Sequence, residues 1–141
     1  MSLDAFLQHA KLHHIGAVVA DLDAASATYV NLGFGQPEMI EIPEQGIRAA
    51  FFSLGRGSIE LLQPVDPDGA IGKFMAKRGE GFHHVAYQVD DLVATLAELE
   101  SRGIELIDHT PRRGAHGLHI AFLHPRSANG VLVELVQEPE H

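Results

Sequence analysis

The chain contains no cysteine, which excludes disulfide bonds and thiolate metal sites from its 141 residues. It is also poor in cations: ten Lys and Arg residues against nineteen Asp and Glu residues leave a formal net charge of −9 with His neutral. That balance argues against a general nucleic-acid-binding or anionic-membrane surface. The sequence has no apolar run of membrane-spanning length, no recognisable signal peptide and no dinucleotide-binding glycine motif. We therefore expect a soluble, cytoplasmic protein with no nucleic-acid or membrane partner.

A short pattern that opens with two histidines occurs twice in the sequence. Its copies, residues 12–22 and 81–92, place His14 and His84 seventy residues apart (84 − 14 = 70). In each copy an apolar run with strand character ends at an Asp followed by Leu, where a helix can begin. The same offset separates the residues that would begin and end each helix, which are Asp21 and Asp91, and Gly33 and Gly103. A spacing shared by strand, helix start and helix stop indicates two copies of one structural module.

The residue pattern predicts the order β-α-β-β-β in each copy. The elements expected in the first copy are a strand at 12–19, a helix between Asp21 and Gly33, an extended segment at 36–42 and strands at 47–54 and 58–63. Those expected in the second are a strand at 82–89, a helix at 91–102, strands at 104–107, 118–123 and 131–137, and a loop at 110–117. Residues 66–81 form a bridge with a short helix at 71–77, and residues 1–10 form a short helical lead-in. We predict an α+β fold in a single domain, residues 1–141, with modules at about 11–66 and about 81–138.

Two lone carboxylates, Glu60 and Glu134, interrupt apolar strands. Burying an unpaired carboxylate costs several kcal/mol, so such groups are usually paired, protonated or bound to a metal. Their separation (134 − 60 = 74) is close to the repeat offset, so each module supplies one strand His and one strand Glu at matching places. The alternative is a structural ion pair with a cation such as Arg48 or Arg113. The matched placement favours a shared functional role, because surface residues have no reason to match across two modules.

The alternation of side chains along a strand places the His and Glu of each module on one face. His14 and Glu60 lie on the even-numbered face of the first module, and His84 and Glu134 lie on the corresponding face of the second. The more apolar odd-numbered faces would pack under the helices. Two imidazoles and two carboxylates lining one concave surface suit a divalent ion such as Zn, Co, Ni or Mn. The first His of each pair points the other way and is predicted to be structural.

Longer segments carry a family resemblance. They are Pro43-Glu44-Gln45-Gly46, Ile59-Glu60-Leu61-Leu62-Gln63-Pro64, Lys77-Arg78-Gly79-Glu80-Gly81-Phe82-His83-His84, and Pro111-Arg112-Arg113-Gly114-Ala115-His116-Gly117 with its continuation through 122–125 to 130–135. With these segments the chain resembles the vicinal oxygen chelate superfamily and, within it, the methylmalonyl-CoA epimerase family, over about residues 11–137. The resemblance implies a curved mixed sheet around a metal-binding cavity and a homodimer. It also implies one divalent metal ion, whose ligands would be His14, Glu60, His84 and Glu134.

The same resemblance implies a substrate and a reaction. The substrate is a 2-substituted malonyl-CoA, an acyl-CoA thioester whose C2 centre inverts when a base removes the proton between two carbonyls and a proton returns to the other face. The metal would stabilise enolate charge, and no redox cofactor is needed. Glu60 and Glu134 are the predicted catalytic residues, because Ala49 stands where some family members carry a Glu; the turn residue Glu44 is a further candidate base. The predicted substrate contacts, near the CoA phosphates, are Arg112, Arg113, Gly114 and His116.

Other functions on this fold are weighed against the epimerase. A glyoxalase I acts on the glutathione hemithioacetal with a similar His/Glu/His/Glu ligand set. A metal-free binding module of the same fold would not need four ligand-type residues. A ring-cleaving dioxygenase normally uses two His and one carboxylate with open positions, so the additional Glu60 argues against it.

Overall fold

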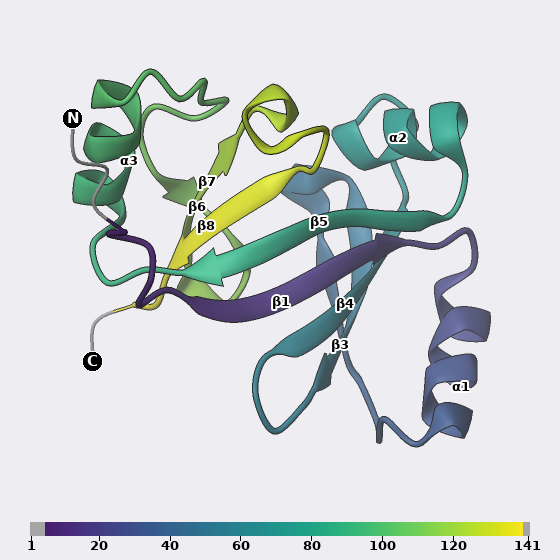
Figure 1. Cartoon of the computed structure of the whole chain (residues 1–141). Coiled ribbons are helices and arrows are strands. Elements are labelled where there is room, and N and C mark those ends of the chain that lie inside the picture. The colour runs from purple at the N-terminus through teal and green to yellow at the C-terminus, as the bar shows by residue number, and fades with distance from the viewer. Residues whose placement is uncertain (1–4, 140–141) are drawn as a thin grey trace. The chain divides into compact units, whose positions relative to one another are not determined.

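The computed structural model describes residues 5–139, and residues 1–4 and 140–141 lie outside it (Figure 1). The helices and strands are β1 (Lys11–Val18), α1 (Leu22–Leu32), β2 (Glu38–Ile42), β3 (Ile47–Ser53), β4 (Ser58–Pro64), α2 (Ala70–Arg78), β5 (Gly81–Gln88), α3 (Leu92–Ser101), β6 (Arg112–Arg113), β7 (His119–Leu123) and β8 (Val133–Gln137). This order confirms the predicted α+β class and the β-α-β-β-β module in both copies. A helical lead-in was expected at residues 1–10. Of these, residues 1–4 lie outside the described part of the chain, and residues 6–9 form a turn.

Two compact units make up the chain, one of residues 14–84 and one that joins the segment up to residue 13 with residues from 85 onward. We call them the 14–84 unit and the terminal unit. Among the described residues, none of the helices combines the length and the apolar character needed to cross a membrane.

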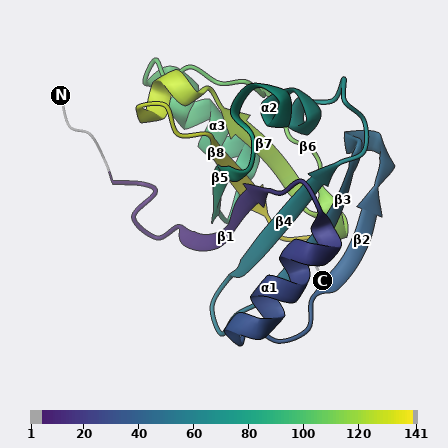
Figure 2. The same ribbon diagram turned by 90° about the vertical axis from the view of Figure 1, so that its right-hand side faces the viewer.

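In the 14–84 unit the strands lie in the order β2-β3-β4-β1. β1 runs parallel to β4, while β4 with β3 and β3 with β2 are antiparallel. Helix α1 covers one face of this sheet and lies across β4 in Figure 2. The predicted parity is confirmed, because Ala17, Ile59 and Leu61 from odd-numbered positions pack in the cluster under α1. Ile15 belongs to the same face but stays 39% exposed, so the helix covers only part of it.

In the terminal unit the strands lie in the order β5-β8-β7-β6, with β5 parallel to β8. Helix α3 buries Leu92, Leu96 and Leu99 against β7 and β8. The strand expected at 104–107 is reduced to a single bridge between Leu106 and Leu123. Side chains replace backbone acceptors on both sides of this bridge. The carboxylate of Asp108 accepts the N–H of Phe122 at 2.8 Å, and the hydroxyl of Ser127 accepts the N–H of Glu105 at 3.0 Å. The second strand of the module is instead β6, which lies in the segment predicted to be a loop.

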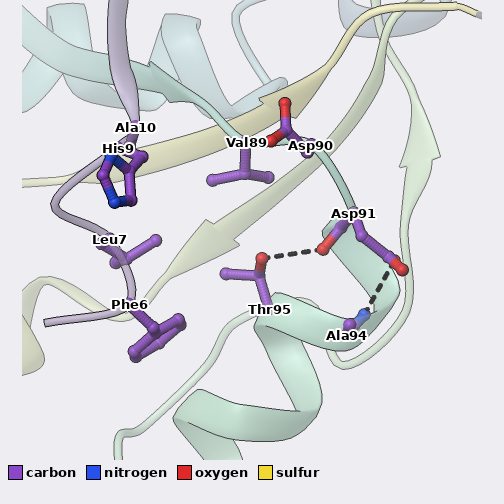
Figure 3. Close-up of a pocket in the computed structure, with 9 residues that line it drawn as sticks. All are labelled: Phe6, Leu7, His9, Ala10, Val89, Asp90, Asp91, Ala94 and Thr95. Atoms are coloured by element: carbon purple, nitrogen blue, oxygen red, sulfur yellow. Dashed lines mark hydrogen bonds between the residues drawn. The ribbon is translucent and has the colours of Figure 1, made fainter. Parts of the chain in front are cut away.

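The two helices that follow the His-His strands begin in the same way. The carboxylates of Asp21 and Asp91 accept the N–H groups of Ala24 and Ala94, at 3.1 and 3.0 Å; Figure 3 shows the second of these caps. A glutamine side chain from the last strand of each module then accepts the first helical N–H at 2.7 Å. The pairs are Gln63 with Leu22, and Gln137 with Leu92. Since these contacts recur at the repeat offsets, the duplication extends to individual hydrogen bonds.

Replacing Gln63 or Gln137 by Ala leaves the helix-start N–H without its side-chain acceptor. We expect each variant to lose about 1 kcal/mol of the free energy of unfolding, the usual contribution of a part-buried hydrogen bond. Urea denaturation followed by circular dichroism measures the loss. The control is Gln36→Ala, at an exposed position before β2, which should change stability by less than about 0.5 kcal/mol. Losses in both variants no larger than that of the control would contradict this assignment.

Candidate functional site

Two buried imidazole rings meet edge to face in the 14–84 unit. His14 from β1 is 3% exposed and His84 from β5 is 4% exposed. Their Nε2 atoms lie 3.0 Å apart, and the ring planes cross at 89°. Two nitrogen ligands of one metal ion, each at about 2.0–2.1 Å and separated by the bond angles of common coordination geometries, lie roughly 2.9–3.4 Å apart. The observed spacing therefore fits a shared cation.

Each of the two rings is also held at its other nitrogen. Nδ1 of His14 lies 3.0 Å from a carboxylate oxygen of Glu60, and Nδ1 of His84 lies 3.0 Å from Nδ1 of His83. A partner at Nδ1 sets the orientation and the tautomer of a histidine, as in protein metal sites. Glu60 thus contacts the first histidine of its predicted ligand set and not Arg48, which pairs with Asp23 at 3.7 Å.

Burial keeps the rings of the second His-His pair neutral near pH 7. Burial lowers the pKa of His83 to about 4. Burial, together with the neighbouring His83, lowers the pKa of His84 to about 3. A neutral imidazole has a lone pair to offer to a metal, so the facing Nε2 atoms of His14 and His84 suit a divalent ion of the zinc or cobalt type.

Gly16 makes room for the ring of His84. It follows His14 by two positions in β1 and shares its face of the strand. A Cβ atom at this position would overlap the His84 ring, approaching Nδ1 to 2.6 Å and Nε2 to 2.8 Å. The absence of a side chain at residue 16 is therefore a requirement of the histidine arrangement.

Glu134 is the buried carboxylate of the terminal unit, with 5% exposure. In the strand pairing, Glu134 lies opposite Ala86 of β5 on one side and opposite Phe122 of β7 on the other. Burial raises its pKa to about 8, although the guanidinium of Arg112 acts in the opposite direction. Arg112 is held over the Phe122 ring at 5.0 Å and lies 3.3 Å from Asp108. Burial therefore favours the neutral form of the Glu134 carboxyl group in the metal-free protein.

The register of the strands places the two glutamates equivalently. Glu60 pairs with Gly16 in the parallel β1–β4 ladder, and Glu134 pairs with Ala86 in the parallel β5–β8 ladder. In each module the glutamate thus faces the residue that follows the second histidine by two. The matching expected from the spacing is present in the backbone pairing of each unit.

Comparison with known proteins identifies the family. Residues 13–122 match the model of the Glyoxalase/Bleomycin resistance protein/Dioxygenase superfamily. An ethylmalonyl-CoA/methylmalonyl-CoA epimerase of Cereibacter sphaeroides is 39% identical over 132 residues, which are 90% of this chain and 97% of that protein. The mitochondrial methylmalonyl-CoA epimerase of Homo sapiens is 38% identical over 129 residues, 90% of this chain and 73% of that protein. This chain belongs to the methylmalonyl-CoA epimerase family.

A solved structure of a methylmalonyl-CoA epimerase in complex with methylmalonyl-CoA and NH4+ shares the fold of this family member. The TM-score is 0.85 at 38% identity, with 92% of this chain and 94% of that chain covered. The resemblance noted in the sequence is thereby confirmed, and this chain is an enzyme of the epimerase type.

The predicted substrate contacts of this epimerase-family chain do not form one loop. Arg112 and Arg113 are consecutive residues of β6, so their side chains leave opposite faces of the strand. The N–H of Gly114 donates to the carbonyl of Leu118 at 2.9 Å and is occupied within the chain. His116 has a left-handed backbone with φ 57° in a short 3-10 helix. Substrate contact by these residues stays a prediction.

Two further positions bear on the choice of a base. Ala49, where some family members carry a Glu, is completely buried in β3, opposite Leu62 and Ile40. Glu44, the further candidate, is exposed in the 3-10 helix Pro43–Gln45. A base role for Glu60 and Glu134, which are both less exposed than Glu44, stays a prediction.

Sequence reasoning missed two residues of this arrangement, His83 and Gly16. His83 was expected to point away from His84 because neighbouring residues of a strand alternate. Its ring nevertheless returns to Nδ1 of His84 and stands edge-on to Phe74 of α2, with centroids 4.8 Å apart. The repeated His-His pair was the available signal for His83. No sequence signal pointed to Gly16, because only the packing of the His84 ring shows why residue 16 has no side chain.

A separate pocket lies in the terminal unit (Figure 3). Its lining residues are Phe6, Leu7, His9, Ala10, Val89, Asp90, Asp91, Ala94 and Thr95. Asp91 is engaged in capping α3, and Phe6 lies under the guanidinium of Arg102 at 4.5 Å. None of these lining residues belongs to the predicted site.

Gly16→Ala tests the packing of the His84 ring. The added methyl group should displace this ring and cost about 1–3 kcal/mol of folding stability, as overpacking of a core does. In a His84→Ala background the same substitution should be neutral or stabilising, because the space is vacant and Ala is better than Gly in a strand. Denaturation of the four proteins gives the coupling free energy between the two positions. Equal costs in both backgrounds would contradict the proposed packing.

Glu134 makes the stability of the metal-free protein depend on pH. Its pKa rises from 4.5 to about 8 on folding, so the unfolded chain releases this proton first. Stability is therefore lost as pH rises between these values, by up to about 1.4 kcal/mol per pH unit. We expect the stability difference between wild type and Glu134→Gln to change with this slope in chelator-treated protein. Denaturation curves at several pH values measure it, and parallel profiles for the two proteins would refute it.

Proposed function

We propose that this protein interconverts the C2 epimers of methylmalonyl-CoA with a divalent metal ion bound by His14, Glu60, His84 and Glu134. We propose a homodimer, as the family resemblance implies. Co, Zn, Ni and Mn all suit the nitrogen and oxygen donors. The substrate assignment is supported by the named activities of the relatives in Cereibacter sphaeroides and Homo sapiens, and by the relative solved with methylmalonyl-CoA.

The observation that carries the proposal is the meeting of two buried imidazoles at 3.0 Å between their Nε2 atoms. Two such rings have little reason to be desolvated together, since each gains only one hydrogen bond from the other. A carboxylate at Nδ1 of His14 and a second glutamate at the matching register of the other module extend the donor set. A divalent cation bound by these residues supplies Lewis-acid stabilisation of negative charge on carbonyl oxygens.

The residues of the chain have to move one proton. The proton at C2 of methylmalonyl-CoA lies between a thioester carbonyl and a carboxylate, so its removal leaves an enolate. Inversion requires a proton acceptor on one face of this enolate and a donor on the other. We assign these roles to Glu134 and Glu60, one on each face. Burial raises the pKa of Glu134 to about 8, which supports its role as a base.

Hydrogen exchange tests both the reaction and the assignment. Incubating the metal-loaded protein with one epimer of methylmalonyl-CoA in D2O should place deuterium at C2 and yield both epimers, and a chelator should stop both. Glu134→Gln and Glu60→Gln should each lower epimerisation by about 10²-fold or more, the usual contribution of a general base. With two bases, each variant should retain exchange without inversion for one epimer only. Mass spectrometry and chiral analysis follow the two outcomes separately.

The control for these variants is Glu138→Gln. Glu138 is exposed and pairs with His13 at 2.9 Å, so its neutralisation should leave exchange and epimerisation unchanged. Absence of C2 exchange by the metal-loaded wild type would refute the epimerase assignment. Turnover of the glutathione hemithioacetal in its place would identify a glyoxalase I, and tight ligand binding without metal would identify a binding module.

A further inference from the structure

His83 is the partner of His84 at the nitrogen that points away from His14. The Nδ1 atoms of His83 and His84 lie 3.0 Å apart, while Nε2 of His84 lies 3.0 Å from Nε2 of His14. A hydrogen bond between two neutral ring nitrogens needs one N–H group and one lone pair. If Nε2 of His84 keeps its lone pair, the proton of that ring is on Nδ1. Nδ1 of His83 must then be the acceptor, and the proton of His83 is on its own Nε2.

The position of His83 is itself supported by α2. The edge of Phe74 stands against the His83 ring with centroids 4.8 Å apart and planes at 82°. The guanidinium of Arg78, one helical turn further on, lies 5.8 Å from the centre of the Phe74 ring. An aromatic edge-to-face pair of this kind restricts the rotation of both rings. Helix α2, the bridge between the modules, thereby holds the acceptor that His84 needs.

The equivalent residue of the first module does not have this role. His13 occupies the position matching His83 (83 − 13 = 70), but its Nε2 pairs with Glu138 at 2.9 Å. The Nδ1 atom of His14 is contacted by Glu60 instead. The two modules thus orient their inner histidines by different means, a carboxylate in the first and a neutral imidazole in the second.

We propose that His83 is a positioning residue, which accepts the Nδ1 proton of His84 and so presents the Nε2 lone pair of His84 to the metal ion. This inference rests on the proposed function only in naming a metal as the occupant at Nε2. Loss of an outer partner of a metal-bound histidine typically weakens metal affinity by 10–100-fold. His83 acts through His84 and touches neither substrate nor metal.

The test uses His83→Phe, which keeps an aromatic ring beside Phe74 but removes the acceptor, and His83→Asn, whose side-chain carbonyl can replace it. Competition of each full-length protein with a chromophoric chelator for Zn²⁺, and separately for Co²⁺, gives the dissociation constant. We expect about 10–100-fold weaker binding for His83→Phe. Binding by His83→Asn should lie within a few-fold of wild type. The matched control His13→Phe should bind as wild type does.

A second measurement follows the hydrogen bond itself and not the affinity for metal. Long-range ¹H–¹⁵N NMR of the Zn²⁺-loaded protein reports the Nδ1 proton of His84, whose exchange with solvent should be slow in wild type and in His83→Asn, where an acceptor holds it. In His83→Phe we expect this proton to exchange faster while the thermal unfolding curve stays cooperative. Unchanged affinity and unchanged exchange of the Nδ1 proton in His83→Phe would overturn the inference. A wild type that binds neither Zn²⁺ nor Co²⁺ would overturn the proposed metal site and, with it, the role of His83.

Discussion

The close approach of His14 and His84 is the constraint on which the rest of the 14–84 unit depends. Two imidazoles desolvated side by side are costly unless every ring nitrogen has a partner. The structure provides these partners at Nδ1, with Glu60 for one ring and His83 for the other. It provides the space through Gly16, whose missing side chain leaves room for the His84 ring. The result is a rigid pair of nitrogen donors, the preorganisation that a metal site requires.

The two glutamates occupy the same register in their modules but experience different surroundings. Glu60 lies at Nδ1 of His14, with 13% of its side chain exposed. Glu134 is more deeply buried, among residues of β5 and β7, and its pKa is raised to about 8 in spite of Arg112. Different environments suit two carboxyl groups to different roles in acid–base chemistry.

Duplication preserved the framework of the modules and allowed their details to diverge. The helix caps by Asp21 and Asp91 recur, and so do the glutamine contacts to the helix starts. These contacts satisfy backbone groups that every copy of the module must satisfy. The side chains beside the inner histidines differ, as does the second strand, which has five residues in the first module and two in the second. Divergence is therefore concentrated where side chains, and not the backbone, determine the contact.

Local patterns in the sequence determined the element order, the helix starts and stops, and the faces that carry His14, Glu60, His84 and Glu134. Strand alternation and capping depend only on near neighbours, which is why they could be read without a structure. Tertiary packing decided the rest. The expected strand at 104–107 is reduced to one bridge, beside which the Asp108 carboxylate accepts a backbone N–H, and the fold placed Arg112 and Arg113 on opposite faces of β6. The return of the His83 ring to His84, and the need for glycine at residue 16, follow from contacts between segments far apart in the chain.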